Sequence, residues 1–247
     1  MNSKIYIANW KMNITSKESK SFFDEFHAFY NHKDNKKVIF CPSYTTLLSA
    51  IQLNSYIKEN NIYFGAQNVS DMPSGAFTGE ISASMLKDIG LDYCIVGHSE
   101  RRSLFNESSK IVNNKIKLLT KSNIIPILCI GETLKQKENS KGEDVITNQL
   151  SVCLEDIPAS KIIIAYEPVW AIGTGKNAGI EDISSMNNVI KNHMNKLGYL
   201  NDQFYILYGG SVNIDNVKVL KTAKHINGFL IGGASLEVDK FLELIKR

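Results

Sequence analysis

The sequence predicts an α/β protein built as one closed (β/α)₈ barrel. Eight short apolar runs alternate with longer segments of helical periodicity, and their typical spacing of about 30 residues is what a βαβ unit requires. The chain has 247 residues, a length at which such barrels routinely fold as one domain, and no stretch has the composition of a linker. We therefore expect a single barrel domain over residues 1–247.

The expected strands are rich in branched apolar residues and lack regular alternation with polar ones. This pattern is typical of parallel strands that are buried on both faces. The eight strands are expected at Ile5–Asn9, Val38–Cys41, Ile62–Ala66, Tyr93–Val96, Ile124–Ile130, Ile162–Tyr166, Phe204–Tyr208 and Phe229–Ile231.

The segments between these runs carry helix caps and apolar stripes. Ser16 is expected to cap the first helix, in which Phe22, Phe26, Phe29 and Tyr30 fall on one face. Aromatic residues at helical spacing favour packing against the barrel over an aromatic cofactor site.

A doubly wound open sheet is the alternative arrangement of alternating strands and helices. It is disfavoured because no Gly-x-Gly-x-x-Gly follows the first strand, where a dinucleotide-binding fold would carry it. In a barrel, sites lie at the carboxyl ends of the strands, and the chemically capable groups of this chain all follow strands. In chain order they are Asn9, Lys11, His98, Glu100, Glu132, Glu167, Ser211, Gly232 and Gly233.

The sixth apolar run ends at Glu167, and a distinctive loop follows it. Pro168 cannot donate a ladder hydrogen bond and therefore ends the strand. Glycines flank Thr174, and bare backbone N–H groups at such a loop tip can approach an anion closely. The pattern predicts a base at the strand end beneath a lid that closes over a phosphate. The expected lid consists of Pro168, Val169, Trp170, Ala171, Ile172, Gly173, Thr174, Gly175 and Lys176.

Several separated motifs match one family in order. Ala165 through Lys176 carries the strand end and lid, and Asn9 through Asn13 is an independent second match. Further matches are Gly65–Asn68, Ser74–Glu80, Gly97–Arg102, Tyr208–Val212 and Gly228–Leu236. Together they give the chain a nearly end-to-end resemblance to the triosephosphate isomerase family.

The resemblance implies a TIM barrel that interconverts dihydroxyacetone phosphate and D-glyceraldehyde 3-phosphate, in glycolysis and gluconeogenesis, without a cofactor. Moving a proton between neighbouring carbons through an enediolate needs one base and a group that stabilises charge on oxygen. The resemblance assigns Glu167 as the base, His98 as a neutral electrophile, and Lys11 as a fixed cation that Asn9 supports. A helix opening after His98 would disfavour imidazolium, because a helix N-terminus carries partial positive charge.

The loops after the seventh and eighth strands are expected to hold the phosphate, as they often do in barrel enzymes. The resemblance implies that Gly173, Ser211 and Gly233 donate to it, with Gly232 beside them. Asn9 and Lys11 belong to the same binding set.

Three further residues are expected to support the site. Glu100 should pair with a basic neighbour such as Lys11 and orient it, while Cys129 and Glu132 lie behind the reacting groups. No His or carboxylate cluster has the spacing of metal ligands, so no metal is expected.

A homodimer is expected from the same resemblance, which assigns Asn68 through Glu80 to a protruding loop. This loop would insert near Met12 and Asn13 of a second copy, where it would bury Phe77 and bring Thr78 close to Lys11.

Composition argues against other classes of function. The net charge is +3 and the lysines are scattered, which gives little support to a nucleic-acid or membrane surface. The cysteines lack Cys-x-x-Cys spacing, and no export signal precedes the first strand, so reduced thiols and a cytoplasmic location are expected. A barrel retained only for binding or adhesion is the other class considered, and the intact catalytic positions disfavour it. The cysteines are Cys41, Cys94, Cys129 and Cys153.

Two stretches depart from the family pattern. Gly179-Ile180-Glu181 stands where members commonly have Thr or Ser followed by Pro and Glu. Lys191 and Asn227 stand where many members have Arg and Asp. We therefore expect the hinge after the lid to differ from that of the family. We also expect the family's charged pair behind the lid to be absent or replaced in this chain.

Overall fold

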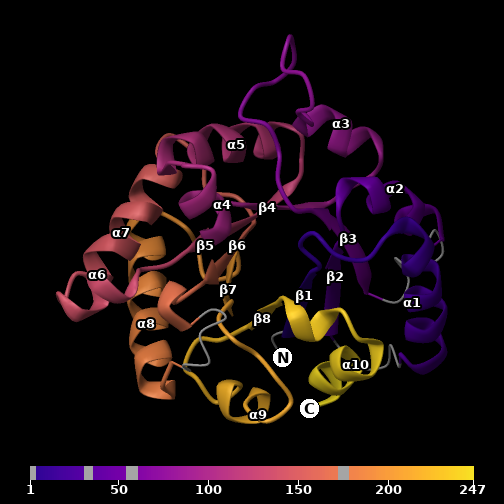
Figure 1. The fold of residues 1–247 in the computed structure, drawn as a ribbon. Coiled ribbons are helices and arrows are strands. Elements are labelled where there is room, and N and C mark those ends of the chain that lie inside the picture. The colour runs from indigo at the N-terminus through magenta and orange to yellow at the C-terminus, as the bar shows by residue number, and fades with distance from the viewer. Residues whose placement is uncertain (1–3, 31–35, 54–60, 172–177) are drawn as a thin grey trace.

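The barrel predicted from the sequence is present. The structure, a computed structural model, describes residues 4–30, 36–53, 61–171 and 178–247. Within them, eight parallel strands form a closed barrel in chain order, with β8 hydrogen-bonded to β1 (Figure 1). The strands are β1 Lys4–Asn9, β2 Lys36–Cys41, β3 Ile62–Ala66, β4 Tyr93–Val96, β5 Ile125–Ile130, β6 Ile162–Tyr166, β7 Phe204–Tyr208 and β8 Gly228–Ile231.

Helices surround the strands on the outside of the barrel (Figure 1). Short 3₁₀ turns at Val169–Ala171 and Gly233–Ser235 follow β6 and β8. The α-helices of the described residues are α1 Ser16–Phe29, α2 Tyr44–Leu53, α3 Ala83–Asp88, α4 Ser99–Leu104, α5 Ser109–Lys121, α6 Leu134–Glu138, α7 Gly142–Cys153, α8 Ile180–Lys196, α9 Val217–Leu220 and α10 Val238–Lys246.

The strand boundaries differ slightly from those predicted. β1 and β2 begin earlier, because Lys4 and Lys36 pair with each other in the ladder although neither is apolar. β5 begins one residue later, because the Ile124 N–H donates to the Leu119 carbonyl at the end of α5 (2.9 Å). A hydropathy pattern detects neither effect, since both depend on backbone pairing.

The first helix corrects two details of the prediction. Its cap is Thr15 and not Ser16, because the Thr15 side chain accepts the Glu18 N–H while the Glu18 carboxylate accepts the Thr15 N–H, which forms a capping box. The prediction also places Phe29 on the buried face, which is wrong because this residue is 61% exposed. Phe23 is buried there instead.

Alternate strand residues face two different cores, which explains the absence of hydropathic alternation. Ile5 and Ile7 point into the barrel interior, whereas Tyr6 and Ala8 pack in the layer between strands and helices. The four cysteines are buried free thiols. Burial raises the pKa of Cys41 and other thiols, which leaves them protonated and unreactive.

The barrel closes where β8 meets β1, and this contact leaves no room for a side chain at Gly228, the first residue of β8. The Ile5 N–H donates to the Asn227 carbonyl (2.9 Å), and Ile5 is the ladder partner of Gly228. A Cβ on Gly228 would lie 1.8 Å from the Ile5 carbonyl oxygen, so closure requires glycine at this position.

Gly228→Ala is therefore expected to lower the free energy of unfolding by about 3 kcal/mol or more, since backbone on two strands must move to relieve the clash. Chemical denaturation monitored by circular dichroism would measure the loss. Gly142→Ala is the matched control, because its Cβ would meet nothing closer than 3.6 Å. Equal stability of the two variants would contradict this account of closure.

Candidate active site

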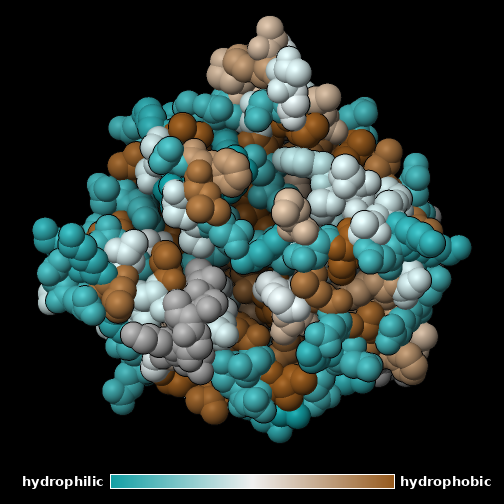
Figure 2. Space-filling model, viewed as in Figure 1, coloured by the Kyte–Doolittle hydropathy of each residue, from teal (hydrophilic) through white to brown (hydrophobic). Residues whose placement is uncertain are grey.

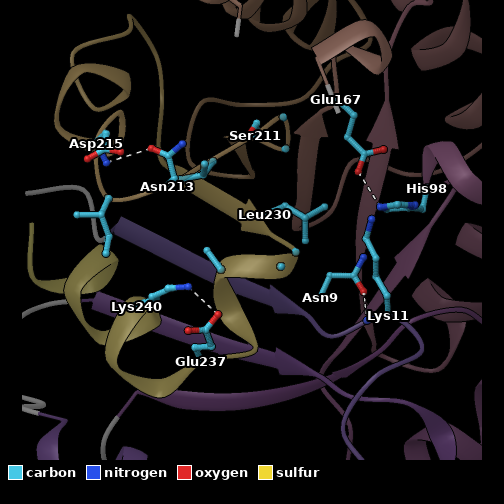
Figure 3. Close-up of a pocket in the computed structure, with 17 residues that line it drawn as sticks. Asn9, Lys11, His98, Glu167, Ser211, Asn213, Asp215, Leu230, Glu237 and Lys240 are labelled. Atoms are coloured by element: carbon cyan, nitrogen blue, oxygen red, sulfur yellow. Dashed lines mark hydrogen bonds and ion pairs between the residues drawn. The ribbon is translucent and has the colours of Figure 1, made fainter. Parts of the chain in front are cut away.

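The side chains predicted to carry chemistry meet at the carboxyl ends of the strands. They line a cavity of about 540 Å³, in which Asn9, Lys11, His98 and Glu167 gather on one side (Figure 3). Ser211, Gly232 and Gly233 also line it, whereas Gly173 lies outside the described residues, as do Ile172, Thr174, Gly175 and Lys176. Five further lining residues belong to motifs matched in the sequence, namely Gly209, Gly210, Val212, Leu230 and Ala234. Lining residues that the sequence did not single out are Asn213, Ile214, Asp215, Glu237 and Lys240.

Glu167 directly follows β6, and both its backbone and its carboxylate are held by neighbouring groups. Its backbone N–H donates to the Ile130 carbonyl (2.8 Å), which extends the β5–β6 ladder to this residue. Its Oε2 accepts the backbone N–H of Ser99 (3.0 Å), and its Oε1 lies 3.1 Å from Nε2 of His98. The side chain is 2% exposed, so these two contacts hold the carboxylate in place.

The contacts of His98 orient its ring. The residue is the N-cap of α4, and its Nδ1 accepts the backbone N–H of Glu100 (3.2 Å). With Nδ1 turned toward α4, Nε2 is the ring nitrogen that faces Glu167. The first turn of α4 thus holds the ring of His98 against Glu167.

Lys11 adopts a left-handed backbone conformation with φ of 53°, a conformation that strains a residue with a side chain. Its N–H donates to Asn9 Oδ1 (3.1 Å), and its carbonyl accepts from Gln67 Nε2 (2.8 Å). Its ammonium pairs with Glu100. Gln67 has a role that the sequence analysis missed, although its place after β3 on the same rim was a usable signal.

Glycines allow the strand ends to approach one another at the cavity. A Cβ on Gly209 would lie 2.8 Å from Glu167 Cγ, and one on Gly210 would lie 2.3 Å from the Tyr208 hydroxyl. A Cβ on Gly232 would lie 3.4 Å from Lys11 Cε. Because Gly209 and Gly232 lack a Cβ, they leave the space that the side chains of Glu167 and Lys11 occupy.

A buried ion cluster supports the loop that carries His98. Glu107 Oε1 accepts the Gly97 N–H (3.1 Å), and Glu107 Oε2 accepts from Arg101 (2.8 Å) and Lys115 (2.5 Å). Burial alone would raise the pKa of Glu107, but the hydrogen bonds from Lys115 and Arg101 outweigh it and hold that pKa below its usual value. The sequence analysis did not identify this cluster.

Glu132 and Cys129 lie behind the cavity and do not line it. Glu132 Oε1 accepts from Trp170 Nε1 (2.8 Å) and from the Tyr166 hydroxyl (3.1 Å), so it anchors the chain just beyond Glu167. Burial, with the nearby Glu167 carboxylate, raises the pKa of the Cys129 thiol well above its usual value.

The two departures from the family pattern have structural counterparts. α8 begins after Gly179 without a side-chain cap, and its first turn is held from outside by an ion pair of Asp182 with Lys137 (2.9 Å). The same ammonium lies 3.8 Å from the centre of the Trp170 ring. Asn227 bonds the backbone of β7 through its side chain (2.8 Å to the Ile206 N–H).

The described residues contain neither a cluster of metal ligands nor a helix that could span a membrane. No group of three or more His, Cys, Asp or Glu side chains there could hold a metal ion. In the same part of the chain, no helix has both the length and the apolar character needed to cross a bilayer.

Comparison with known proteins gives the family of this chain. The family model described as "Triosephosphate isomerase" matches residues 4–247. The chain belongs to the triosephosphate isomerase family. It is thus an enzyme of the isomerase class.

Curated relatives match essentially from end to end. A triosephosphate isomerase of Mesomycoplasma hyorhinis is 43% identical over 246 residues, which cover 99% of this chain and 98% of the relative. The triosephosphate isomerase of Finegoldia magna is 42% identical over 251 residues, which cover 99% of this chain and 98% of the relative. That of Dictyoglomus thermophilum is 41% identical over 251 residues, which cover the whole of both chains (100% and 100%).

Gly209→Ala is expected to reduce turnover by roughly 10²-fold while leaving the fold intact, because a displacement of about 1 Å in a reacting group can cost that much. The added methyl group would push Glu167 away from His98 and Ser99. Isomerase kinetics and a thermal melt would separate the two effects, with Gly142→Ala as control. Unchanged turnover in a folded variant would contradict the role given to Gly209.

Proposed function

We propose that the protein interconverts dihydroxyacetone phosphate and D-glyceraldehyde 3-phosphate through an enediolate. The observation that carries the proposal is the buried Glu167 carboxylate, 3.1 Å from Nε2 of His98, whose Nδ1 accepts the backbone N–H of Glu100. A base and a proton donor thus face the same cavity (Figure 3). The names of the relatives, which cover the chain from end to end, support the same reaction.

In this mechanism Glu167 removes a proton from the substrate carbon next to the carbonyl and returns it to the neighbouring carbon. The Nε2–H of His98 donates to the substrate oxygens on which negative charge develops. The Lys11 ammonium stabilises the same charge, and Asn9 fixes the Lys11 backbone through a 3.1 Å hydrogen bond. The substrate oxygens would replace Glu167 as the acceptor for His98.

The phosphate is assigned to the opposite end of the substrate. Ser211, Gly232 and Gly233 line the cavity there, and the Cβ that Gly233 lacks would meet nothing within 4 Å, so its backbone is open to a ligand. Gly173 is proposed as a further donor from a lid of residues 168–176, an assignment that rests on the family resemblance. We place the enzyme in glycolysis and gluconeogenesis in the cytoplasm, as one catalytic domain over residues 1–247 that needs no cofactor.

Coupled assays in both directions test the reaction. The purified protein should convert each triose phosphate into the other, with activity that persists in EDTA. Glu167→Gln should reduce kcat by about 10²–10⁴-fold, the usual contribution of general base catalysis, whereas Glu138→Gln on the exposed surface should not. Inactivity of the folded wild-type protein on both substrates would refute the proposal. Loss of activity in EDTA would indicate a metal-dependent reaction instead.

We further propose that the enzyme is a homodimer, because apolar side chains gather where no part of the described chain covers them. The segment between β3 and α3 projects beyond the ring of helices, and its tip carries apolar surface (Figures 1 and 2). Phe77 in this segment is 41% exposed, and Phe105 is 64% exposed. Met12, next to Lys11, is 95% exposed. A partner that covers Met12 and Asn13 would restrict the loop that carries Lys11, with Thr78 as the proposed contact.

Sedimentation equilibrium at micromolar concentration should give a dimer mass. Phe77→Glu should shift the equilibrium to monomer and lower activity, because a charge buried in an interface without a partner is strongly unfavourable. Leu200→Glu is the control, since Leu200 is also an exposed apolar residue but lies outside this region. A fully active wild-type monomer would refute the dimer.

A further inference from the structure

A second cavity lies between α6, α7 and α8, beside the chain that follows β6. These three helices are neighbours on one side of the barrel (Figure 1). The cavity has a volume of about 390 Å³, which is in the usual range for small-molecule sites. Among the described residues, it shares no lining residue with the catalytic cavity. It is therefore a separate candidate for a ligand site, and we call it the acidic cavity.

The acidic cavity carries an excess of negative charge, although the chain as a whole is basic with a net charge of +3. Four carboxylates and one ammonium line it, so three negative charges are in excess. Lys137 pairs with Asp182 (2.9 Å). Within the described part of the chain, no lysine, arginine or histidine nitrogen lies within 4 Å of the remaining three carboxylates. These three carboxylates belong to Glu132, Glu143 and Asp144.

One oxygen of Glu132 has two donors, and the other has none. The residue is 2% exposed, and its Oε1 accepts from Trp170 Nε1 (2.8 Å) and from the Tyr166 hydroxyl (3.1 Å). Burial, followed by the charge of Glu132, raises the pKa of Tyr166, so this hydroxyl stays protonated and donates. Oε2 is also buried and has no hydrogen-bond partner among the described residues. A buried carboxylate oxygen without a donor is unfavourable, so a ligand that donates to Oε2 would be stabilising.

The wall of the acidic cavity next to Glu132 consists of a small and a flexible residue. Gly142 is the first residue of α7, and a Cβ there would lie 3.6 Å from Glu132 Cγ and 3.7 Å from Met186 Cε. Glycine thus leaves space beside the Glu132 side chain. Met186 is half-buried, and its unbranched side chain can move to admit a ligand and pack against its apolar part.

We propose that the acidic cavity binds an aliphatic diamine, with one ammonium group on Glu132 and the other on Glu143 and Asp144. The carboxylates share one cavity without converging on a point, since no group of three in the described residues could hold a metal ion. Separated carboxylates match a ligand whose two charges are separated by methylene groups. An ammonium group has three N–H donors and supplies the donor that Oε2 lacks, while the methylene groups pack against Met186.

Calorimetric titration of the intact wild-type protein with 1,4-diaminobutane at low ionic strength tests the proposal. We expect saturable binding at one site, which weakens as sodium chloride screens the charges. Butylamine, with a single ammonium group, should bind at least about 3-fold more weakly, and the neutral 1,4-butanediol should not bind. Because the net charge of the protein is positive, diffuse attraction does not explain saturable binding of a dication. Absence of saturable binding, or equal affinity for butylamine, would overturn the proposal.

Variants of the acidic cavity locate the ligand. Glu132→Gln keeps an acceptor oxygen for Trp170 and Tyr166 but removes the charge, and should weaken binding about 10-fold. The double variant Glu143→Gln/Asp144→Asn changes exposed side chains only and should weaken binding about 3-fold. Unchanged affinity in either folded variant would overturn the proposal. Glu138→Gln is the matched control, since Glu138 is exposed on α6 but does not line the cavity, and its affinity should equal that of the wild type.

Trp170 provides a second readout that is independent of isomerase activity. Its indole N–H donates to the same carboxylate that the ligand would contact, so binding should change its fluorescence. The other tryptophan, Trp10, packs against Phe22 and Phe23 in the core. The fluorescence change should follow the calorimetric affinity and disappear in Trp170→Phe. A change that persists in Trp170→Phe would place the ligand elsewhere and contradict the proposal.

Discussion

Closure of the parallel barrel is the constraint on which the rest of this structure depends. When β8 pairs with β1, the carboxyl ends of all eight strands form a single rim, and the residues that follow them converge on one cavity. The contact between Gly228 and Ile5 is the tightest point of this closure, because a methyl group there would overlap a backbone carbonyl. Residues as distant in sequence as Asn9, His98 and Glu167 become neighbours for this reason.

On the rim, backbone groups orient the reacting side chains. The N–H of Ser99 holds Glu167, and the N–H of Glu100 holds the ring of His98 through Nδ1. Both belong to the first turn of α4, whose position depends in turn on the buried Glu107 cluster. A short helix therefore fixes Glu167 and His98 relative to each other, which is the arrangement that the proposed proton transfer requires.

The two faces of the barrel place lysines in opposite electrostatic environments. At the carboxyl face, the ammonium of Lys11 pairs with the carboxylate of Glu100. At the amino face, Lys221 meets Lys4 and Lys36, and burial together with these charges lowers its pKa to about 8. The same residue type therefore meets a carboxylate on one face, whereas burial and neighbouring cations disfavour its charged form on the other.

The sequence by itself determined the number and order of the strands, since burial on both faces leaves apolar runs that can be counted. It also determined the rim position of Glu167, His98 and Lys11, because each follows such a run. The tertiary structure alone decided the contacts that depend on packing between distant segments. These include Gln67 on the Lys11 carbonyl, the Glu107 cluster and the three lysines at the amino face. Hydropathy records whether a residue is buried, but a hydrogen bond or a pKa depends on which other groups the closed barrel brings within reach.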